Sequence, residues 1–329
     1  MVRIAQYGTG HGHAAGKMRS MQQNPDVEFA GVFEPDAQRR AATKGAFADV
    51  IWFESEAEML GDESIVAIAS EGRNDESLAQ TEAIVAAGKH VWYDKPAGND
   101  WKHVQRVFAA AKESTVHIQM GYMLRYHESF RQVAEWVRSG FLGDVFSVRA
   151  HMSTFLTPPA QQAIADCHDG GILYDLSGHM LDQIVWMLGR PVSVTSFLRN
   201  DSGQVAAFKD NCLGVYEFET AIATVDIAAI ETRPMARRFE VYGTKGSAII
   251  LEPFEPGNRI RLCLDEARDG YEEGEQLIEM TTRGRQECYD AELVDFIGVV
   301  RDGREPIRDL DHELLVQETI LRAAGELRG

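Results

Sequence analysis

The sequence lacks any run of about 18 consecutive apolar residues, the length that a membrane-spanning helix requires. Its first residues, MVRIAQYG, have the pattern of a β-strand and contain no apolar segment of the kind found in secretory signals. Positive charge is also scarce, because 33 Lys and Arg stand against 51 Asp and Glu and leave a formal net charge of −18. Such a chain repels phosphate backbones and anionic lipids at long range. We therefore expect a cytoplasmic protein that binds neither nucleic acid nor a membrane.

Cysteine is rare as well. The chain has Cys167, Cys212, Cys263 and Cys288, which lie far apart and form no CxxC pair. This spacing argues against a disulfide framework and against a cysteine-based zinc cluster, so reduced thiols are expected. What the chain does have is length: 329 residues, 44% hydrophobic and 26% charged, are enough for two globular domains.

Residues 1–124 alternate short apolar runs with helical patterns, the rhythm of repeated βα units. This rhythm predicts an α/β domain with a doubly wound parallel sheet of the Rossmann type and six strands. Helical patterns cover residues 75–87 and 101–112. The predicted strands are Val2–Tyr7, Phe29–Phe33, Ile51–Phe53, Ile65–Ala69, His90–Tyr93 and His117–Tyr122.

Residues 125–329 change to strands at hairpin-like spacing, which predict an α+β domain with a mostly antiparallel open sheet. A loop is expected around Pro158 and Pro159. The last helix could pack on its own domain or back on the first one. The predicted helices are Glu128–Ser139, Ile172–Leu188, Tyr289–Arg301 and His312–Leu327, and the predicted strands are Val145–Ser153, Val192–Leu198, Cys212–Phe218, Thr224–Glu231, Arg238–Tyr242, Ser247–Leu251, Ile260–Leu264 and Leu277–Met280.

A glycine-rich turn, GTGHGH, directly follows the first predicted strand and precedes a helix. Gly8 would allow a tight turn, and Gly10 would let the backbone approach a pyrophosphate at the positive end of that helix. His13 occupies the third position of the G-x-G-x-x-G pattern, where a glycine is usual. The pattern indicates a dinucleotide site, and a glycine-rich turn without a nucleotide is the alternative.

An acidic residue, Glu34, follows the second predicted strand at the place where a carboxylate accepts hydrogen bonds from the adenosine ribose. A carboxylate there also repels a 2′-phosphate, so the sequence favours NAD over NADP. NADP stays open because Arg39 and Arg40 lie in the next helix and could compensate. The alternative for Glu34 is a solvated loop residue.

Two segments carry side chains suited to alcohol chemistry. Lys95 follows the fifth predicted strand at the carboxyl edge of the sheet, where its ammonium could stabilise an alkoxide, unless it is only a surface lysine. Asp175 and His179 lie four residues apart on one helix face, where the carboxylate could orient the imidazole as a general base. Asp175, His179 and Asp182 together could instead bind a metal ion, and His179 could also be a buried histidine of the core. No second histidine-rich segment at ligand spacing supports a metal, so none is predicted.

Several ordered motifs together resemble those of the Gfo/Idh/MocA oxidoreductases, the family of glucose-fructose oxidoreductase and inositol dehydrogenase. They cover nearly the whole chain and read GTGHGH, AAGKHVWYDKPAG, GYMLRY, SGFLGDV, GGILYDLSGHMLDQIVWMLGRP and VYGTKGSAIILE. The resemblance implies an N-terminal Rossmann domain and a C-terminal α+β domain whose open sheet forms oligomer contacts, hence a homodimer or homotetramer. It also implies NAD(P)-dependent oxidation or reduction of sugars, cyclitols and related polyols.

Carried over position by position, the resemblance makes Lys95, Asp175 and His179 catalytic and substrate-binding residues, with Arg125 and Tyr126 as further substrate contacts. It assigns cofactor contacts to the glycine-rich turn and to the ends of later strands. These contacts are Gly8, Thr9, Gly10, His11, His13, Glu34, Ser70, Asp94, Lys95 and Pro96.

The chain departs from the family at two positions. Asp94 stands where the family has Glu, and Ser77 stands where its "TPN…H" segment has His. We predict an NAD-dependent dehydrogenase in which His179 is the general base and Lys95 polarises the reacting oxygen. Two alternatives remain: a tightly bound NAD recycled in glycoside cleavage or sugar-sugar oxidoreduction, and a sensor of nucleotide or sugar that has no catalytic activity.

Overall fold

The computed structural model describes residues 1–43, 45–255 and 257–327. Its contacts divide the chain into two compact units, each with its own sheet. Unit 1 comprises Met1–Tyr122 and Gln286–Leu314, and unit 2 comprises Met123–Arg285 and Leu315–Gly329. The chain therefore leaves unit 1, forms most of unit 2, and returns. The predicted boundary at residue 124 stays a prediction.

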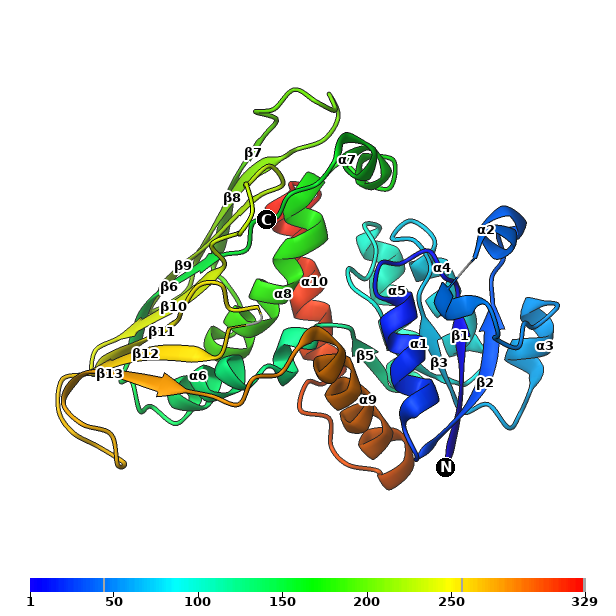
Figure 1. Cartoon of the computed structure of the whole chain (residues 1–329), viewed down its shortest axis with the longest axis horizontal. Coiled ribbons are helices and arrows are strands. Elements are labelled where there is room, and N and C mark those ends of the chain that lie inside the picture. The colour runs from blue at the N-terminus through cyan, green and yellow to red at the C-terminus, as the bar shows by residue number, and fades with distance from the viewer. Residues whose placement is uncertain (44, 256, 328–329) are drawn as a thin grey trace. The chain divides into compact units, whose positions relative to one another are not determined.

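Unit 1 contains a five-stranded sheet in which all neighbouring strands are parallel, in the order β2-β1-β3-β4-β5 (Figure 1). Helices between the strands cover the sheet, which is why most strand residues are buried and apolar. The strands are β1 (Val2–Tyr7), β2 (Val27–Phe33), β3 (Ala67–Ser70), β4 (His90–Tyr93) and β5 (Ile118–Met120), and the helices are α1 (Ala14–Gln23), α2 (Ala37–Ala42), η1 (Gly45–Phe47), α3 (Glu56–Gly61), α4 (Ser77–Ala86) and α5 (Trp101–Glu113).

The prediction of six strands is wrong, because Ile51–Phe53 does not form a strand. Only Trp52 forms a bridge, to Val32 of β2, held by two backbone hydrogen bonds of 2.8 and 3.0 Å. The chain then turns away at once, because the hydroxyl of Ser55 caps α3 by accepting a hydrogen bond from the N–H of Glu58. A single bridge is too short to form a strand.

The core of unit 1 is completed from far along the chain. Helix α9 (Arg285–Asp302) contributes Leu293, Phe296 and Ile297, which pack with Ile4 of β1 and Trp92 of β4. The Phe296 and Trp92 rings are stacked, with their centroids 6.5 Å apart. The segment after residue 285 is therefore part of the first sheet's hydrophobic core.

Unit 2 contains an eight-stranded sheet in the order β13-β12-β11-β10-β6-β9-β8-β7. All neighbouring pairs are antiparallel except β6 and β9, which are parallel. Together the two sheets confirm the predicted α/β plus α+β fold class. The strands are β6 (Val145–His151), β7 (Ser193–Arg199), β8 (Asn211–Glu217), β9 (Ile222–Ala228), β10 (Arg238–Gly243), β11 (Gly246–Ile250), β12 (Arg259–Leu264) and β13 (Gly274–Glu279).

One face of this sheet is packed and the other is open. Helices α6 (Glu128–Arg138) and α8 (Gly171–Leu188) lie along one face, while no helix of the described chain covers the other (Figure 1). The open face carries exposed apolar side chains, among them Phe197, Ile222 and Leu277, each more than half exposed. Helix α10 (Leu310–Ala324) ends the described helices of the chain.

The expected loop around Pro158 and Pro159 contains a helix instead, α7 (Pro158–Ala165). Proline is favoured in the first turn of a helix because its missing N–H has no intrahelical partner there. The two prolines thus begin this helix.

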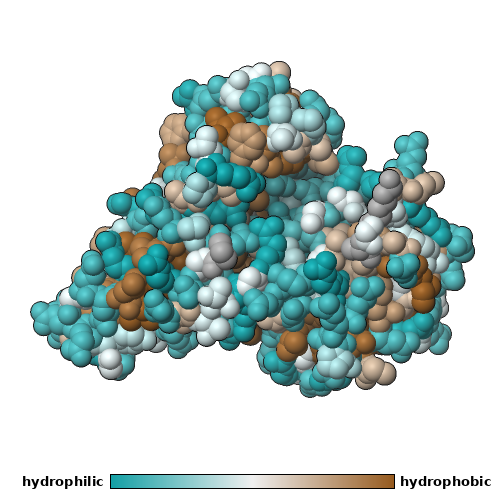
Figure 2. Space-filling model, in the orientation of Figure 1, coloured by the Kyte–Doolittle hydropathy of each residue, from teal (hydrophilic) through white to brown (hydrophobic). Residues whose placement is uncertain are grey.

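No helix in the described part of the chain is long and apolar enough to cross a membrane. The face drawn in Figure 2 is mostly hydrophilic, and its hydrophobic residues form small separate groups.

Candidate functional site

The glycine-rich turn lies between the carboxyl end of β1 and the start of α1. Gly8 has φ +86°, and a Cβ there would lie 2.7 Å from the backbone nitrogen of Gly72, so only glycine fits. At Gly12 a Cβ would meet nothing within 4 Å, so the turn is open on that side. The turn is closed against its neighbours and accessible at the helix N-terminus, which suits a phosphate group.

The carboxylate of Glu34 holds this turn in place by hydrogen bonds. Its Oε2 accepts hydrogen bonds from the backbone nitrogen and the hydroxyl of Thr9, at 2.8 and 2.7 Å. Its Oε1 accepts from Nε and Nη2 of Arg39, at 3.1 and 2.9 Å, and from the backbone nitrogen of Asp36 at 2.9 Å. Glu34 is buried, so the solvated-loop alternative is wrong.

Arg39 joins Glu34 to a second carboxylate. Its Nη1 and Nη2 donate to the two oxygens of Glu76 at 3.0 and 2.7 Å. Partial burial lowers the pKa of Arg39, but the hydrogen bonds to Glu76 and Glu34 outweigh it and raise that pKa above its usual value. A cavity of about 490 Å³ opens beside this ion pair; it is lined by Tyr7, Pro35, Asp36, Arg39, Glu56, Glu76, Ala79 and Gln80.

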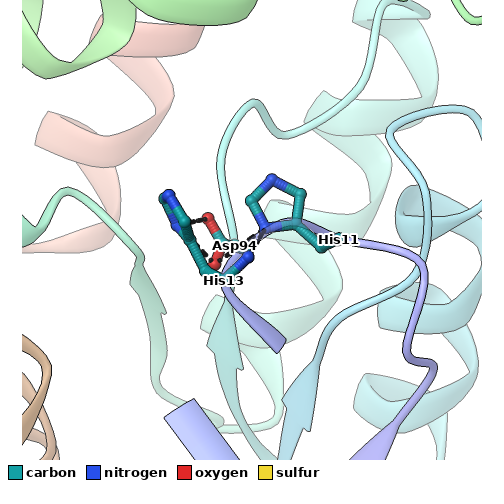
Figure 3. A group of neighbouring side chains, drawn as sticks. All are labelled: His11, His13 and Asp94. Atoms are coloured by element: carbon teal, nitrogen blue, oxygen red, sulfur yellow. Dashed lines mark hydrogen bonds and ion pairs between the residues drawn. The ribbon is translucent and has the colours of Figure 1, made fainter. Parts of the chain in front are cut away.

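A second cluster surrounds Asp94, at the end of β4. Figure 3 shows the imidazoles of His11 and His13 on two sides of its carboxylate. His13 Nδ1 lies 3.1 Å from both carboxylate oxygens, and His11 Nδ1 lies 3.2 Å from Oδ2. Burial alone would raise the pKa of Asp94, but the two histidines and Lys17 hold it well below its usual value. Burial lowers the pKa of His13 to about 4, so its imidazole is neutral at physiological pH.

The ammonium of Lys17, on α1, lies beneath this cluster and is fully buried. Its Nζ is 3.2 Å from Asp94 Oδ2 and 3.2 Å from Glu71 Oε1. Burial raises the pKa of the Glu71 carboxyl well above its usual value, although Lys17 opposes this. Burial alone would lower the pKa of Lys17. Asp94 and Glu71 outweigh this effect and raise the pKa above its usual value, so the ammonium stays charged.

The predicted catalytic Lys95 follows Asp94 directly and is 4% exposed. Its backbone nitrogen donates to Asp94 Oδ1 at 2.7 Å, and its peptide bond to Pro96 is cis. The surface-lysine alternative is therefore wrong. Ser70 ends β3 at the same edge, with a buried hydroxyl that accepts from Thr81 at 3.0 Å. Contacts of these residues with a cofactor stay predictions.

In unit 2, helix α8 carries the predicted acid-base pair. Gly171 begins it with φ +60°, and a Cβ there would lie 2.5 Å from the carbonyl oxygen of Lys209, which accepts from Ile172 at 2.9 Å. The double glycine of the motif thus lets α8 start against the segment before β8. Asp175 and His179 lie one turn apart on this helix, with His179 2% exposed.

Arg125 lies in the short helix η2 (Met123–Tyr126) and is buried. Its Nε and Nη2 donate to Asp182 Oδ1 at 2.9 and 2.7 Å, while Gln183 donates to Oδ2 at 2.9 Å. Asp182, the third polar residue of the α8 row, therefore holds Arg125. The backbone carbonyl of Tyr126 accepts from Arg283 at 3.0 Å. Substrate contacts of Arg125 and Tyr126 stay predictions, as does a meeting of Lys95 with the α8 pair.

Sequence reasoning missed Lys17 and Glu76. A signal existed for Lys17, because it lies four residues after His13 on a helix whose neighbours Met18 and Met21 are apolar and buried. No comparable pattern marked Glu76, whose partner Arg39 comes from a distant helix.

The sequence matches two family descriptions: "Oxidoreductase family, NAD-binding Rossmann fold" over residues 2–122 and "GFO/IDH/MocA C-terminal domain" over residues 130–249. It is 25% identical over 195 residues to the 1,5-anhydro-D-fructose reductase of Ensifer adhaerens, covering 58% of this chain and 59% of that protein. It is 27% identical over 231 residues to the scyllo-inositol 2-dehydrogenase (NAD(+)) of Bacillus subtilis, covering 68% and 64%. The matched regions thus span less than two thirds of both relatives. The crystal structure of GenD2 from gentamicin A biosynthesis, in complex with NAD, shares the fold with a TM-score of 0.78 at 22% identity, covering 99% of this chain and 93% of that one.

Proposed function

The chain belongs to the Gfo/Idh/MocA family of oxidoreductases, and from this premise we propose that it is an NAD-dependent dehydrogenase acting on a secondary alcohol of a sugar, cyclitol or related polyol. The observation that carries the proposal is a set of three features at the carboxyl edge of one parallel sheet. They are the turn at Gly8 after β1, Glu34 after β2 and Lys95 after β4. Open α/β sheets bind their ligands at this edge.

The residues of the turn suit a dinucleotide. Gly8 keeps the turn tight, and the first N–H groups of α1 would hold the pyrophosphate. The cavity of about 490 Å³ is large enough for the adenosine. When bound, the nicotinamide supplies the hydride acceptor.

The charges around this cavity favour NAD over NADP. Asp36, Glu56 and Glu76 line it, and the carboxylate of Glu34 lies beside it, while Arg39 is the one guanidinium among its lining residues. Arg39 is already engaged by two carboxylates. A 2′-phosphate would bring further negative charge into this acidic surrounding.

The proton chemistry is assigned to three side chains. His179 accepts the proton from the substrate hydroxyl, and Asp175, one turn earlier, orients and stabilises the imidazolium. Lys95 donates a hydrogen bond to the reacting oxygen and stabilises its developing negative charge. Arg125 and Tyr126 bind further substrate hydroxyls.

We further propose that the active form is a homodimer or homotetramer joined through the open face of the unit 2 sheet. Phe197, Ile222 and Leu277 are exposed on that face, and a second copy of the same face would bury them. No disulfide joins the cysteines of the described residues, which fits a cytoplasmic location. Light scattering of the purified protein measures the oligomeric state.

Formation of NADH from NAD and a panel of sugars and cyclitols tests the enzymatic proposal. We expect turnover that requires added NAD and produces NADH in proportion to the substrate consumed. Turnover without added nucleotide and without net NADH would favour the recycled-cofactor alternative. Ligand binding without any turnover would favour the sensor.

A further inference from the structure

Three metal-ligating side chains from two separate segments converge at the turn. His11 and His13 directly precede α1, and Asp94 follows β4. Each offers one donor atom, and these atoms all lie within 4.8 Å of one another. Figure 3 shows both imidazoles directed at the carboxylate.

The closest of these separations match the spacing of ligands around a small metal ion. His13 Nδ1 lies 3.1 Å from Asp94 oxygens, and His11 Nδ1 lies 3.2 Å from Oδ2. Two ligands about 2.0 to 2.1 Å from a tetrahedral ion are about 3.3 Å apart. We propose that His11, His13 and Asp94 bind one divalent transition-metal ion of the zinc or cobalt type. The same three side chains are predicted cofactor contacts, so the ion would bind at the proposed dinucleotide site, and metal binding measured without nucleotide tests this proposal separately from the dehydrogenase activity.

The internal hydrogen bonds of the cluster leave room for a cation. The backbone nitrogen of His13 approaches His11 Nδ1 at 3.2 Å and donates to it, so that nitrogen carries a lone pair. The same nitrogen lies 3.2 Å from Asp94 Oδ2, which is also an acceptor. A metal ion at this place would be bound by both the imidazole nitrogen and the carboxylate oxygen.

A buried carboxyl group lies behind the cluster. Glu71 is fully buried, and its Oε1 lies 3.2 Å from the ammonium of Lys17. Its Oε2 lies 3.8 Å from His11 Nδ1. Glu71 therefore places a further oxygen atom near His11 without being one of the three proposed ligands.

Lys17 competes with a metal ion for the Asp94 carboxylate but does not occupy the side of it that faces the histidines. Its ammonium contacts Asp94 Oδ2 and Glu71 Oε1, each at 3.2 Å, so one positive charge is shared between two carboxyl groups. Both oxygens of Asp94 lie 3.1 Å from His13 Nδ1, and Oδ1 also accepts from the backbone nitrogen of Lys95 at 2.7 Å. The metal would therefore bind on the histidine side of the carboxylate.

The ligand set selects the class of metal. Two imidazoles and one carboxylate suit zinc, cobalt or nickel, whereas magnesium and calcium prefer oxygen ligands alone. Three protein ligands also leave a coordination position open for water or for an oxygen atom of an anionic molecule.

Titration of the untagged, chelator-treated protein with Co²⁺ tests the proposal, because cobalt bound by imidazole absorbs visible light. We expect one ion per chain, displaced by Zn²⁺ and not by Mg²⁺. His11→Gln and His13→Gln should each weaken cobalt binding by about 10- to 100-fold or more.

His151→Gln is the matched control. Its two ring nitrogens contact Asp226 and Glu231, so His151 also lies between carboxylates, but among the described residues it belongs to no group of three metal-ligating side chains. Unchanged cobalt binding in His151→Gln is expected, and loss of binding in that variant would overturn the assignment.

A second measurement avoids variants that fail to fold. The ring-nitrogen NMR signals of His11 and His13 in the unaltered protein should shift when Zn²⁺ is added. Unchanged signals for both histidines, or full cobalt affinity in a folded His11→Gln, His13→Gln double variant, would overturn the proposal.

Discussion

The buried ammonium of Lys17 lies 4.5 Å from the centre of the Trp92 ring and forms a cation–π contact with it. Trp92 belongs to β4, and Asp94 directly follows that strand, so the lysine is held both by the strand and by the carboxylate after it. This contact connects α1 to the segment that carries Lys95. The stability of unit 1 and the geometry of its candidate site therefore depend on the same side chain.

Lys17→Met should destabilise the protein by about 3 to 5 kcal/mol, because it leaves Asp94 and Glu71 buried without their cation. Urea unfolding followed by circular dichroism measures this change. Lys112→Met is the control, since Lys112 pairs with Asp311 at an exposed position and should cost at most about 1 kcal/mol. Equal losses in both variants would contradict the role given to Lys17.

Gly8→Ala should destabilise the protein by about 1 to 3 kcal/mol and weaken NAD binding, because Ala is strained at φ +86° and its Cβ would clash with Gly72. Gly12→Ala, in the same turn, meets nothing within 4 Å and should leave stability unchanged. Thermal unfolding and NAD titration compare the two. A stable Gly8→Ala variant with normal NAD affinity would remove the turn from the dinucleotide site.

Glu76→Gln should raise the use of NADP relative to NAD. It removes one negative charge from the cavity and releases part of Arg39 to contact a 2′-phosphate, and a charge at such a site is worth about 1 kcal/mol, or roughly fivefold. The ratio of kcat/KM for the two nucleotides measures the effect. Glu82→Gln, in helix α4 that begins directly after Glu76, removes a carboxylate that pairs with His103 and Arg106 and should leave the ratio unchanged.

His179→Ala should lower kcat by roughly 100-fold or more while the protein stays folded, because the substrate hydroxyl loses its proton acceptor. Steady-state kinetics on the substrate found in the panel measure this loss. Asp175→Asn should have a smaller effect in the same direction. Near-normal turnover of His179→Ala would exclude this histidine as the base.

His151 should make stability depend on pH. The hydrogen bond to Asp226 and the contact with Glu231 raise the pKa of His151, although partial burial lowers it. Its stabilising contribution is thus fully present below the unfolded-state pKa of about 6.5 and is lost as the pH rises through the higher folded-state pKa. Unfolding curves from acidic to alkaline pH should show this loss in the unaltered protein. His151→Gln should flatten that part of the profile, and an unchanged profile would refute the assignment.

Local motifs predicted the parts of the site that lie close together in sequence. The turn at Gly8 and the acid at Glu34 each follow a strand directly, so the strand pattern alone placed them at the sheet edge. His11, His13 and Asp94 were expected as cofactor contacts, but their meeting with Lys17 and Glu71 was not predicted, because these two residues come from other elements and reach Asp94 only after the sheet forms. For the same reason no metal site was expected there.

The fold was predicted less well where tertiary packing decides whether a segment forms a strand, a helix or a loop. Ile51–Phe53 has the composition of a strand, but the cap at Ser55 ends it after one bridge. Pro158 and Pro159 were predicted to lie in a loop because proline interrupts a helix at interior positions. In the first turn proline is favoured, and here the two prolines begin α7. Composition gave no indication that α9 completes the core of unit 1.

That return of the chain has a consequence for synthesis on the ribosome. The nascent N-terminal segment cannot bury Ile4 and Trp92 fully until Leu293 and Phe296 have been translated, which at about 5 to 20 residues per second takes roughly 10 to 40 s after residue 122 emerges. During this interval an apolar surface of the first sheet faces the solvent. The newborn polypeptide is therefore a natural client for chaperones, and a fragment truncated near residue 124 should aggregate when expressed alone.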